Sequence, residues 1–260
     1  MRTLLVLGLL ALGADAAAKV RTKTVEYREG SAVLEGYLAW DDSIEGRRPG
    51  VLVIHEWTGI NDYVRGRVRQ LAGLGYVAFA ADIYGKGVRP EGPKEAAAQA
   101  TKFKSNRKLM RARAAAGLAV LQKQPQTDGR RIAAIGYCFG GTVALELARS
   151  GASVRGAVSF HGGLDTPDPT DARRIKGKVL VLHGAADPHV PPAEVQAFEK
   201  EMHEARVDWQ MVLYGGAVHA FTNPSRGRDP SKGAAYDPRA DRRSWAAMKL
   251  FFAEIFGKKG

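Results

Sequence analysis

The feature that most constrains the fold is a repeated alternation between short apolar segments and longer segments with apolar residues at helical spacing. Continuous apolar runs are typical of strands buried on both faces of a parallel sheet, with helices covering those faces. The expected strands are residues 51–54, 76–81, 131–137, 155–160, 178–182 and 209–214, and the expected helices are residues 61–75, 94–123, 141–150, 194–206 and 242–256. Before them, alternating apolar residues over 23–40, interrupted at Gly30, predict an antiparallel hairpin. The pattern therefore predicts an α/β fold with a mostly parallel central sheet and helices on both faces.

Length and composition suit one such domain. The chain has 260 residues, 45% of them hydrophobic, which is enough to build a packed core and excludes intrinsic disorder. No internal repeat or long linker marks a second domain, so we expect a single domain over residues 19–260. The only cysteine excludes an intrachain disulfide and a cysteine-based zinc site. We expect neither a metal nor a cofactor.

The N-terminal segment has the pattern of a secretory signal peptide. An apolar run over residues 4–12 follows Arg2, and residues 14–18 offer small-residue cleavage sites. The run is too short to span a bilayer, which needs about 20 residues. The pattern predicts that residues 1–18 are a cleaved signal peptide and that the mature protein is periplasmic or secreted, without membrane contact. An uncleaved N-terminal anchor is the alternative.

The net charge of +12 raises the question of nucleic-acid binding. No aromatic-interleaved basic motif accompanies the charge, and an exported protein meets little nucleic acid. Basic residues such as Lys104, Arg107 and Arg111 fall at helical spacing, and we interpret such runs as solvated helix faces. We expect a monomer with no nucleic-acid partner. The alternative from another class of protein is a non-catalytic exported binding protein for acidic polymers.

The most informative segment is 136–141, Gly-Tyr-Cys-Phe-Gly-Gly, between a predicted strand and a predicted helix. This is the G-x-nucleophile-x-G elbow, with cysteine where serine is more usual. A strand that turns abruptly into a helix strains the central residue and leaves no room for side chains two positions away, so glycines are needed there. The helix N-terminus favours a thiolate. The segment predicts that Cys138 is a nucleophile; an inert buried cysteine is the alternative.

Two further strand ends carry groups that can activate a nucleophile. Asp187 follows the predicted strand 178–182, and His219 follows the predicted strand 209–214. The chain order nucleophile, acid, histidine is that of the α/β-hydrolase triad and differs from the chymotrypsin and subtilisin orders. All three residues come just after the carboxyl ends of strands, where open α/β sheets bind their ligands. We therefore expect a triad of Cys138, Asp187 and His219.

A fourth strand end, after residues 51–54, suggests the second half of an oxyanion hole. The backbone N–H groups of Trp57 and Phe139 are the pair that we expect to hold a tetrahedral oxyanion. Glu56 is an unusual residue beside an apolar strand, which favours a functional role for its carboxylate.

These residues resemble the dienelactone hydrolase family over nearly the whole mature chain. The motifs that carry the resemblance are Ile-His-Glu at 54–56, Ala-Asp-Ile-Tyr-Gly at 81–85, the elbow at 136–141, His-Gly-Ala-Ala-Asp-Pro at 183–188 and His-Ala-Phe-Thr-Asn-Pro at 219–224. The resemblance implies an α/β-hydrolase fold and hydrolysis of a small ester or lactone. It makes Cys138 the nucleophile, His219 the base and Asp187 its orienting group, with Glu56 helping to ionise the thiol.

Substrate recognition is the point at which the sequence departs from the family. Two arginines hold the substrate carboxylate in the family; one maps near Lys86, which keeps the charge, and the other falls at Asn223. We therefore expect general ester or lactone hydrolysis rather than true dienelactone hydrolysis (carboxymethylenebutenolidase activity), which remains the alternative. Tyr84 and His161 are further candidates to line the cleft, and His189 is a less favoured rival for the base.

Overall fold

The computed structural model describes residues 19–257. The predicted signal peptide lies outside the described residues, so it stays a prediction, as do the export of the protein and its monomeric state. Among the helices of residues 19–257, none combines the length and the apolar character needed to cross a membrane.

An eight-stranded sheet forms the centre of the described chain, in the order β1-β2-β4-β3-β5-β6-β7-β8. Its strands are β1 (Val20–Glu29), β2 (Ala32–Asp41), β3 (Arg48–Ile54), β4 (Val77–Ala81), β5 (Thr127–Tyr137), β6 (Gly156–Phe160), β7 (Lys178–Gly184) and β8 (Trp209–Tyr214). β1 and β2 form an antiparallel hairpin, β2 pairs antiparallel with β4, and the remaining neighbours are parallel. The expected α/β fold with a mostly parallel sheet and an N-terminal hairpin is confirmed.

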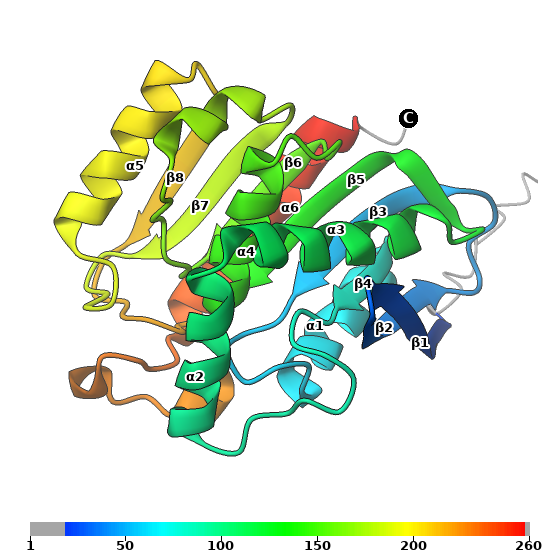
Figure 1. Cartoon of the computed structure of the whole chain (residues 1–260), viewed down its shortest axis with the longest axis horizontal. Helices are drawn as coiled ribbons and strands as arrows, with labels where there is room; N and C mark the ends of the chain where they lie inside the picture. Colours follow the sequence, from blue (N-terminus) through cyan, green and yellow to red (C-terminus); the bar gives the residue numbers. More distant parts are fainter. Residues whose placement is uncertain (1–18, 258–260) are drawn as a thin grey trace, which may run out of the picture.

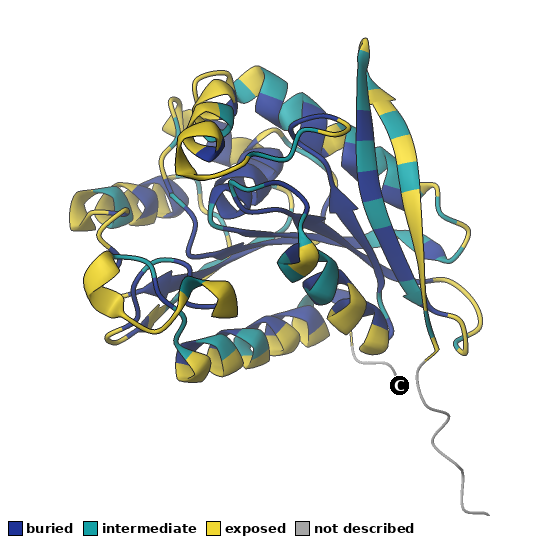
Figure 2. Ribbon diagram, turned by 90° about the horizontal axis from the view of Figure 1, so that it is seen from below, coloured by how far each residue is buried: buried dark blue, intermediate teal, exposed yellow. Residues whose placement is uncertain are grey.

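Helices cover both faces of this sheet (Figure 1). They are α1 (Asp62–Gly73), α2 (Pro93–Lys104), α3 (Arg107–Gln122), α4 (Phe139–Arg149), α5 (Pro192–Glu204) and α6 (Pro238–Phe256), with short 3₁₀ turns η1 (Pro169–Arg174), η2 (Pro224–Arg226) and η3 (Pro230–Lys232). The buried faces of α1 and α6 share one apolar cluster, whereas those of α3, α4 and α5 belong to clusters on the opposite face. Figure 2 shows the buried central strands between these helical layers.

The central strands are apolar on both faces because each face carries a helix layer. In β3, Val51 and Val53 join the cluster under α1 and α6, whereas Leu52 and Ile54 join the cluster under α3 and α4. Alternate side chains of a strand point to opposite faces, so a strand between two layers needs an apolar residue at every position. This is the physical basis of the continuous apolar runs in the sequence.

The segment 94–123, expected as one helix, is two helices. α2 ends at Lys104, and α3 begins after Asn106, whose side-chain oxygen accepts a hydrogen bond from the backbone N–H of Leu109 at 3.0 Å. Asparagine is favoured at this position because its side chain satisfies an N–H group that every helix start leaves without a partner. The single-helix prediction is wrong because this cap outweighs the helix propensity of the alanine-rich sequence around it. The break lets α2 leave the direction of α3 (Figure 1).

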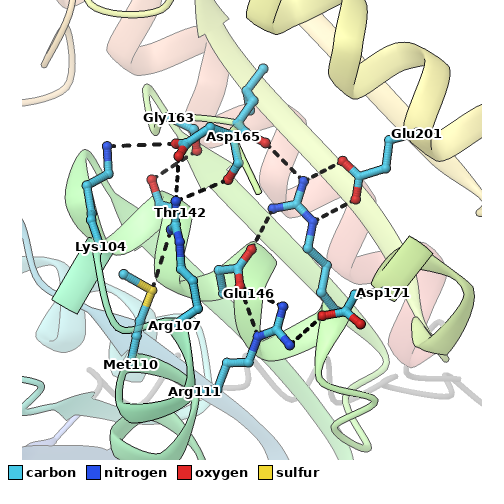
Figure 3. Close-up of polar contacts among 12 residues, drawn as sticks. Lys104, Arg107, Met110, Arg111, Thr142, Glu146, Gly163, Asp165, Asp171 and Glu201 are labelled. Carbon is cyan, nitrogen blue, oxygen red and sulfur yellow. Dashed lines mark hydrogen bonds and ion pairs between the residues drawn. The ribbon is translucent and has the colours of Figure 1, made fainter. Parts of the chain in front are cut away.

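Basic residues of α3 are paired with acids inside the fold. Arg107 pairs with Asp165 at 2.5 Å, and Arg111 pairs with Glu146 at 2.8 Å and with Asp171 at 2.5 Å (Figure 3). The two arginine side chains are only 10% and 18% exposed. Their interpretation as a solvated helix face is therefore wrong, since loops after β6 and the neighbouring helix α4 bring carboxylates to them.

Arg149 on α4 is the centre of this buried network. Its side chain is fully buried and makes a bidentate contact with Glu201 of α5, at 2.8 and 2.6 Å. It also donates to Glu146 at 3.0 Å and to the carbonyl oxygen of Leu164 at 2.9 Å. A buried charge is tolerated only when such partners replace its lost hydration. The network consequently ties α4, which begins directly after Cys138, to the helix and loops around it.

We expect Arg149→Ala to lower the free energy of unfolding by about 3–5 kcal/mol, because it leaves the Glu201 carboxylate buried without its counter-charge. Urea unfolding followed by circular dichroism measures the change. The matched control is Lys200→Ala on α5, whose side chain is 75% exposed and 3.8 Å from Glu204; such a surface pair contributes about 0–1 kcal/mol. Equal effects of the two substitutions would contradict the assignment of Arg149 as the centre of the network.

Candidate active site

The elbow at Cys138 joins β5 to α4 through a strained backbone. Cys138 has φ 55° and ψ −119°, in a region that non-glycine residues rarely occupy. A Cβ atom added to Gly136 would lie 1.8 Å from the carbonyl oxygen of Gly140, and one added to Gly140 would lie 2.3 Å from the carbonyl oxygen of Ile54. Both flanking glycines are therefore required sterically, and the turn presents the Cys138 side chain at the carboxyl end of the sheet.

Three strand ends bring Cys138, His219 and Asp187 into contact. His219, from the loop after β8, has its Nε2 atom 3.0 Å from the Cys138 Sγ atom. Its Nδ1 atom lies 2.8 Å from Oδ2 of Asp187, which follows β7. The other carboxylate oxygen of Asp187 accepts the backbone N–H of His189 at 2.8 Å, which fixes the orientation of the carboxylate. The structure thus places the three side chains in the order that acyl-transfer chemistry uses.

The electrostatics of this contact favour a charged pair. Burial by itself lowers the pKa of His219, but the charge of the Cys138 thiolate and the hydrogen bonds to Asp187 and Cys138 outweigh it and raise the pKa of His219 to about 10. His219 is thus an imidazolium when Cys138 is a thiolate. The Asp187 side chain has no exposed surface, so water does not weaken its hydrogen bond to the imidazole ring.

A cavity of about 240 Å³ opens beside Cys138. Trp57 and Phe139 contribute apolar lining, while Lys104 of α2 and Arg226 from the loop after β8 contribute positive charge. No carboxylate side chain of residues 19–257 lines it. The cavity is therefore an apolar cleft with two cationic groups, of which Lys104 also lies 3.8 Å from Asp165, and this positive charge favours an anionic substrate.

The two expected oxyanion donors both border this cavity. Phe139 is the first residue of α4, and the first N–H groups of a helix have no acceptor within it. Trp57 follows β3 and lines the same cavity as Cys138. The structure therefore brings both residues to the cavity that Cys138 lines.

Glu56 lies in the core of the site and contacts Asn223. Its Oε2 atom accepts a hydrogen bond from the Asn223 amide at 2.6 Å, and its Oε1 atom is buried with no partner among the described residues. Burial raises the pKa of the Glu56 carboxyl, while the nearby Arg226 charge and the Asn223 amide act in the opposite direction. The structure pairs Glu56 with Asn223 and shows no hydrogen bond to Cys138, which is the group it was expected to ionise.

Comparison with known proteins agrees with this geometry. Residues 34–256 match the dienelactone hydrolase family over most of the chain. The chain belongs to the dienelactone hydrolase family. Members of this family are α/β-hydrolases, and the protein is accordingly a hydrolase that acts on esters or lactones.

Two solved structures and one curated relative show the extent of the similarity. The protein named m3DLH is 44% identical, with a TM-score of 0.88, over 91% of this chain and 98% of its own. A dienelactone hydrolase-like promiscuous phosphotriesterase from metagenomic libraries is 42% identical, with a TM-score of 0.87, over 91% and 98% of the two chains. A protein of Synechocystis named "Putative carboxymethylenebutenolidase" is 27% identical over 90% of this chain and 96% of its own.

Lys86, which the family resemblance placed at the substrate carboxylate, lies outside the cavity. Its ammonium group pairs with Glu26 of β1 at 2.5 Å, and both side chains are about half exposed, at 49% and 52%. Its backbone N–H donates to the carbonyl oxygen of Val33 at 2.9 Å, which holds this turn against the N-terminal hairpin. In this structure the Lys86 ammonium group is held by Glu26, and the substrate contact that the resemblance implied stays a prediction.

Tyr84 and His161 contact residues that line the cavity of this dienelactone hydrolase family member. The Tyr84 hydroxyl donates to the carbonyl oxygen of Trp57 at 3.0 Å, and its ring packs against Phe139 with a centroid distance of 5.4 Å. His161 is fully buried and contacts the backbone of Cys138. Neither side chain is among those that line the cavity, and their contact with substrate stays a prediction.

Arg226, like Lys104, is a charged cavity residue that sequence reasoning missed. It ends the 3₁₀ turn η2, which the Asn223 side chain caps by accepting the backbone N–H of Ser225 at 3.0 Å. The turn places the Arg226 guanidinium 5.9 Å from the centre of the Trp57 ring, and its Nε atom is buried with no hydrogen-bond partner in the described chain. The available signal was a basic residue in the loop that carries His219, three positions beyond Asn223.

The charged pair makes a prediction for the reactivity of Cys138. Because the raised pKa of His219 keeps an imidazolium 3.0 Å from the sulfur below about pH 10, its positive charge favours the thiolate over the thiol at neutral pH. The rate of alkylation by iodoacetamide should therefore fall less between pH 8 and pH 6 in the wild-type protein than in His219→Ala. In His219→Ala the rate should fall about 75-fold between pH 8 and pH 6, as for a free thiol with a pKa of about 8.5. A parallel fall in the wild-type protein would contradict the charged pair.

Proposed function

We propose that the protein hydrolyses carboxylic esters or lactones with Cys138 as nucleophile, His219 as acid and base, and Asp187 as the group that orients His219. The observation that carries this proposal is the pair of contacts at 3.0 Å and 2.8 Å that joins the three side chains. Those residues reach the site from β5, β7 and β8, and they meet at a cavity large enough for a small ester.

In the first step, the Cys138 thiolate attacks the carbonyl carbon. The negative charge that develops on the carbonyl oxygen is stabilised by the backbone N–H groups of Trp57 and Phe139. When the tetrahedral intermediate collapses, the carbon–oxygen bond to the alcohol breaks, and the His219 imidazolium gives its proton to that oxygen. The products are a thioester on Cys138 and a free alcohol, or a tethered hydroxyl group if the substrate is a lactone.

In the second step, neutral His219 takes a proton from water, and the hydroxide attacks the thioester. Cys138 then leaves as a thiolate beside the His219 imidazolium, and the acid product is released. Asp187 supports both steps, because its hydrogen bond to Nδ1 holds the ring with Nε2 toward Cys138 and stabilises the imidazolium.

We test the nucleophile with Cys138→Ala. Its hydrolysis of p-nitrophenyl acetate should fall at least about 10³-fold, because loss of a triad nucleophile leaves only binding and oxyanion stabilisation. The control is Ser150→Ala, beyond the end of α4, whose hydroxyl bonds only the carbonyl oxygen of Leu147, at 2.7 Å. Hydrolysis by Cys138→Ala at the rate of the control would overturn the proposal.

A second candidate function, carboxymethylenebutenolidase activity, is favoured by Arg226. The sequence placed Asn223 where the family has a substrate-binding arginine, and this departure argued against a carboxylate-bearing lactone. Arg226, three residues later in the same loop, puts a guanidinium in the cavity, and Lys104 adds a second cation from α2. We propose that these two side chains recognise the carboxylate of an anionic ester or lactone.

We expect Arg226→Gln to raise KM for an anionic lactone or ester about 10- to 100-fold, because a hydrogen bond to a charged group contributes about 1.5–3 kcal/mol. KM for a neutral ester should stay within about twofold, since the lost charge has no partner in that substrate. Steady-state kinetics on a matched pair of anionic and neutral esters measures the difference. Lys232→Gln in the same loop is the control, because Lys232 is 74% exposed and does not line the cavity. Equal changes for both esters would contradict the role of Arg226.

A further inference from the structure

His161 lies directly behind the nucleophile and contacts its backbone. The side chain is fully buried at the end of β6, and its Nδ1 atom lies 3.1 Å from the backbone nitrogen of Cys138. This N–H group is shared with the carbonyl oxygen of Phe160, at 3.0 Å, and it can donate to Nδ1 of His161 only if that nitrogen is unprotonated. The imidazole ring must then be neutral with its proton on Nε2.

The Nε2 atom of His161 has a matching acceptor in Thr222. The Thr222 hydroxyl lies 2.7 Å from Nε2 and is also hydrogen-bonded to the Tyr63 hydroxyl, at 2.6 Å. Arg67 holds the Thr222 backbone by donating to its carbonyl oxygen at 2.8 Å. The Thr222 hydroxyl can donate or accept, so it fits the tautomer that the Cys138 N–H requires: it then accepts the proton of Nε2 and donates its own to the Tyr63 hydroxyl.

These contacts connect the two loops whose separation sets the reacting distance. Cys138 belongs to the elbow after β5, whereas Thr222 follows His219 in the loop after β8. The His161 and His219 rings meet edge to face with centroids 5.4 Å apart. Burial and the neighbouring His219 charge lower the pKa of His161, so no second imidazolium faces the one that pairs with Cys138.

Backbone strain is concentrated around the same contacts. Four non-glycine residues of the described chain have positive φ, and three of them are Cys138 at 55°, His161 at 41° and Ala220 at 55°. Such conformations cost about 1–3 kcal/mol each and persist only where the surrounding structure holds them. The hydrogen bonds of His161 join two of these strained positions and reach the loop that contains the third.

We propose that His161 is a positioning residue: its neutral ring, hydrogen-bonded to the backbone of Cys138 and to the hydroxyl of Thr222, bridges the Cys138 elbow and the His219 loop and keeps the sulfur and the imidazole at reacting distance. The proposal rests on the roles proposed above for Cys138 and His219, and it adds a residue that does not line the cavity.

The tautomer can be measured in the unmodified enzyme. Long-range ¹H–¹⁵N correlation spectra of the ¹⁵N-histidine-labelled protein, assigned with His161→Gln, should show His161 neutral and protonated at Nε2 at pH 7. A ring protonated at Nδ1, or at both nitrogens, would overturn the proposal.

The effect on chemistry is tested with Thr222→Val and Thr222→Ser, which remove and keep the hydroxyl in side chains of similar size. Thr222→Val should lower kcat for p-nitrophenyl acetate about 10- to 100-fold, with KM changed by less than about threefold, because it disturbs positioning and leaves the cavity lining unchanged. Thr222→Ser should restore most of kcat. Melting temperatures show whether each variant is folded. Wild-type kcat in folded Thr222→Val, or an equal loss of kcat in both variants, would overturn the proposal.

These results separate the inference from the proposed function. If Cys138→Ala retains activity, the proposed nucleophile is wrong, whatever the tautomer of His161. If Cys138→Ala is inactive and Thr222→Val is fully active, the nucleophile stands and the positioning role of His161 fails.

Discussion

The close approach of the elbow to β3 is the constraint on which the site depends. Gly140 has room for no side chain because the carbonyl oxygen of Ile54 would lie 2.3 Å from its Cβ atom, so the start of α4 lies against the end of β3. This contact brings Trp57, which follows β3, beside Cys138 and Phe139 at the cavity. The parallel pairing of β3 with β5, with Ile54 opposite Gly136, sets the register of that approach. A backbone contact thus brings together Cys138, the N-terminus of α4 and the loop that carries Trp57.

Charge is distributed differently at the site and in the rest of the molecule. Behind the elbow, the arginines of α3 and α4 are matched by buried or partly buried carboxylates, which hold α4 in place (Figure 3). Arg226 and Lys104 line the same cavity as Cys138, and no carboxylate side chain of residues 19–257 is in that lining. The buried carboxyl of Glu56, whose pKa the Arg226 charge lowers, is held by Asn223. Lys104 also lies 3.8 Å from Asp165, whereas Arg226 brings its positive charge to the cavity with no ion pair among the described residues.

Most helices and strands could be predicted from the sequence, because apolar residues recur at helical spacing in the helices and form short continuous runs in the strands. The exceptions have local causes. Asn106 interrupts an alanine-rich segment because its side chain caps the start of α3. The average composition of the segment favours one continuous helix and does not reveal that this one hydrogen bond starts a new helix. Lys86 and Arg226 show that resemblance to a family gives the position of a residue in the chain but not its contacts. The contact of Lys86 is set by Glu26, which is distant in sequence, and the position of Arg226 is set by the local geometry of the turn η2.

The sequence by itself determined the α/β class, the elbow at Cys138 and the order of Cys138, Asp187 and His219, because glycine spacing, apolar periodicity and chain order are properties of neighbouring residues. Only the tertiary structure decided which polar groups share the site. Glu56 and Asn223 are separated by 167 positions in the sequence, yet the Asn223 amide nitrogen lies 2.6 Å from the Glu56 carboxylate. The two ring nitrogens of His161 contact Cys138 and Thr222. Such contacts depend on how strand ends and loops converge at one edge of the sheet, and their energies depend on burial, which no local pattern of residues specifies.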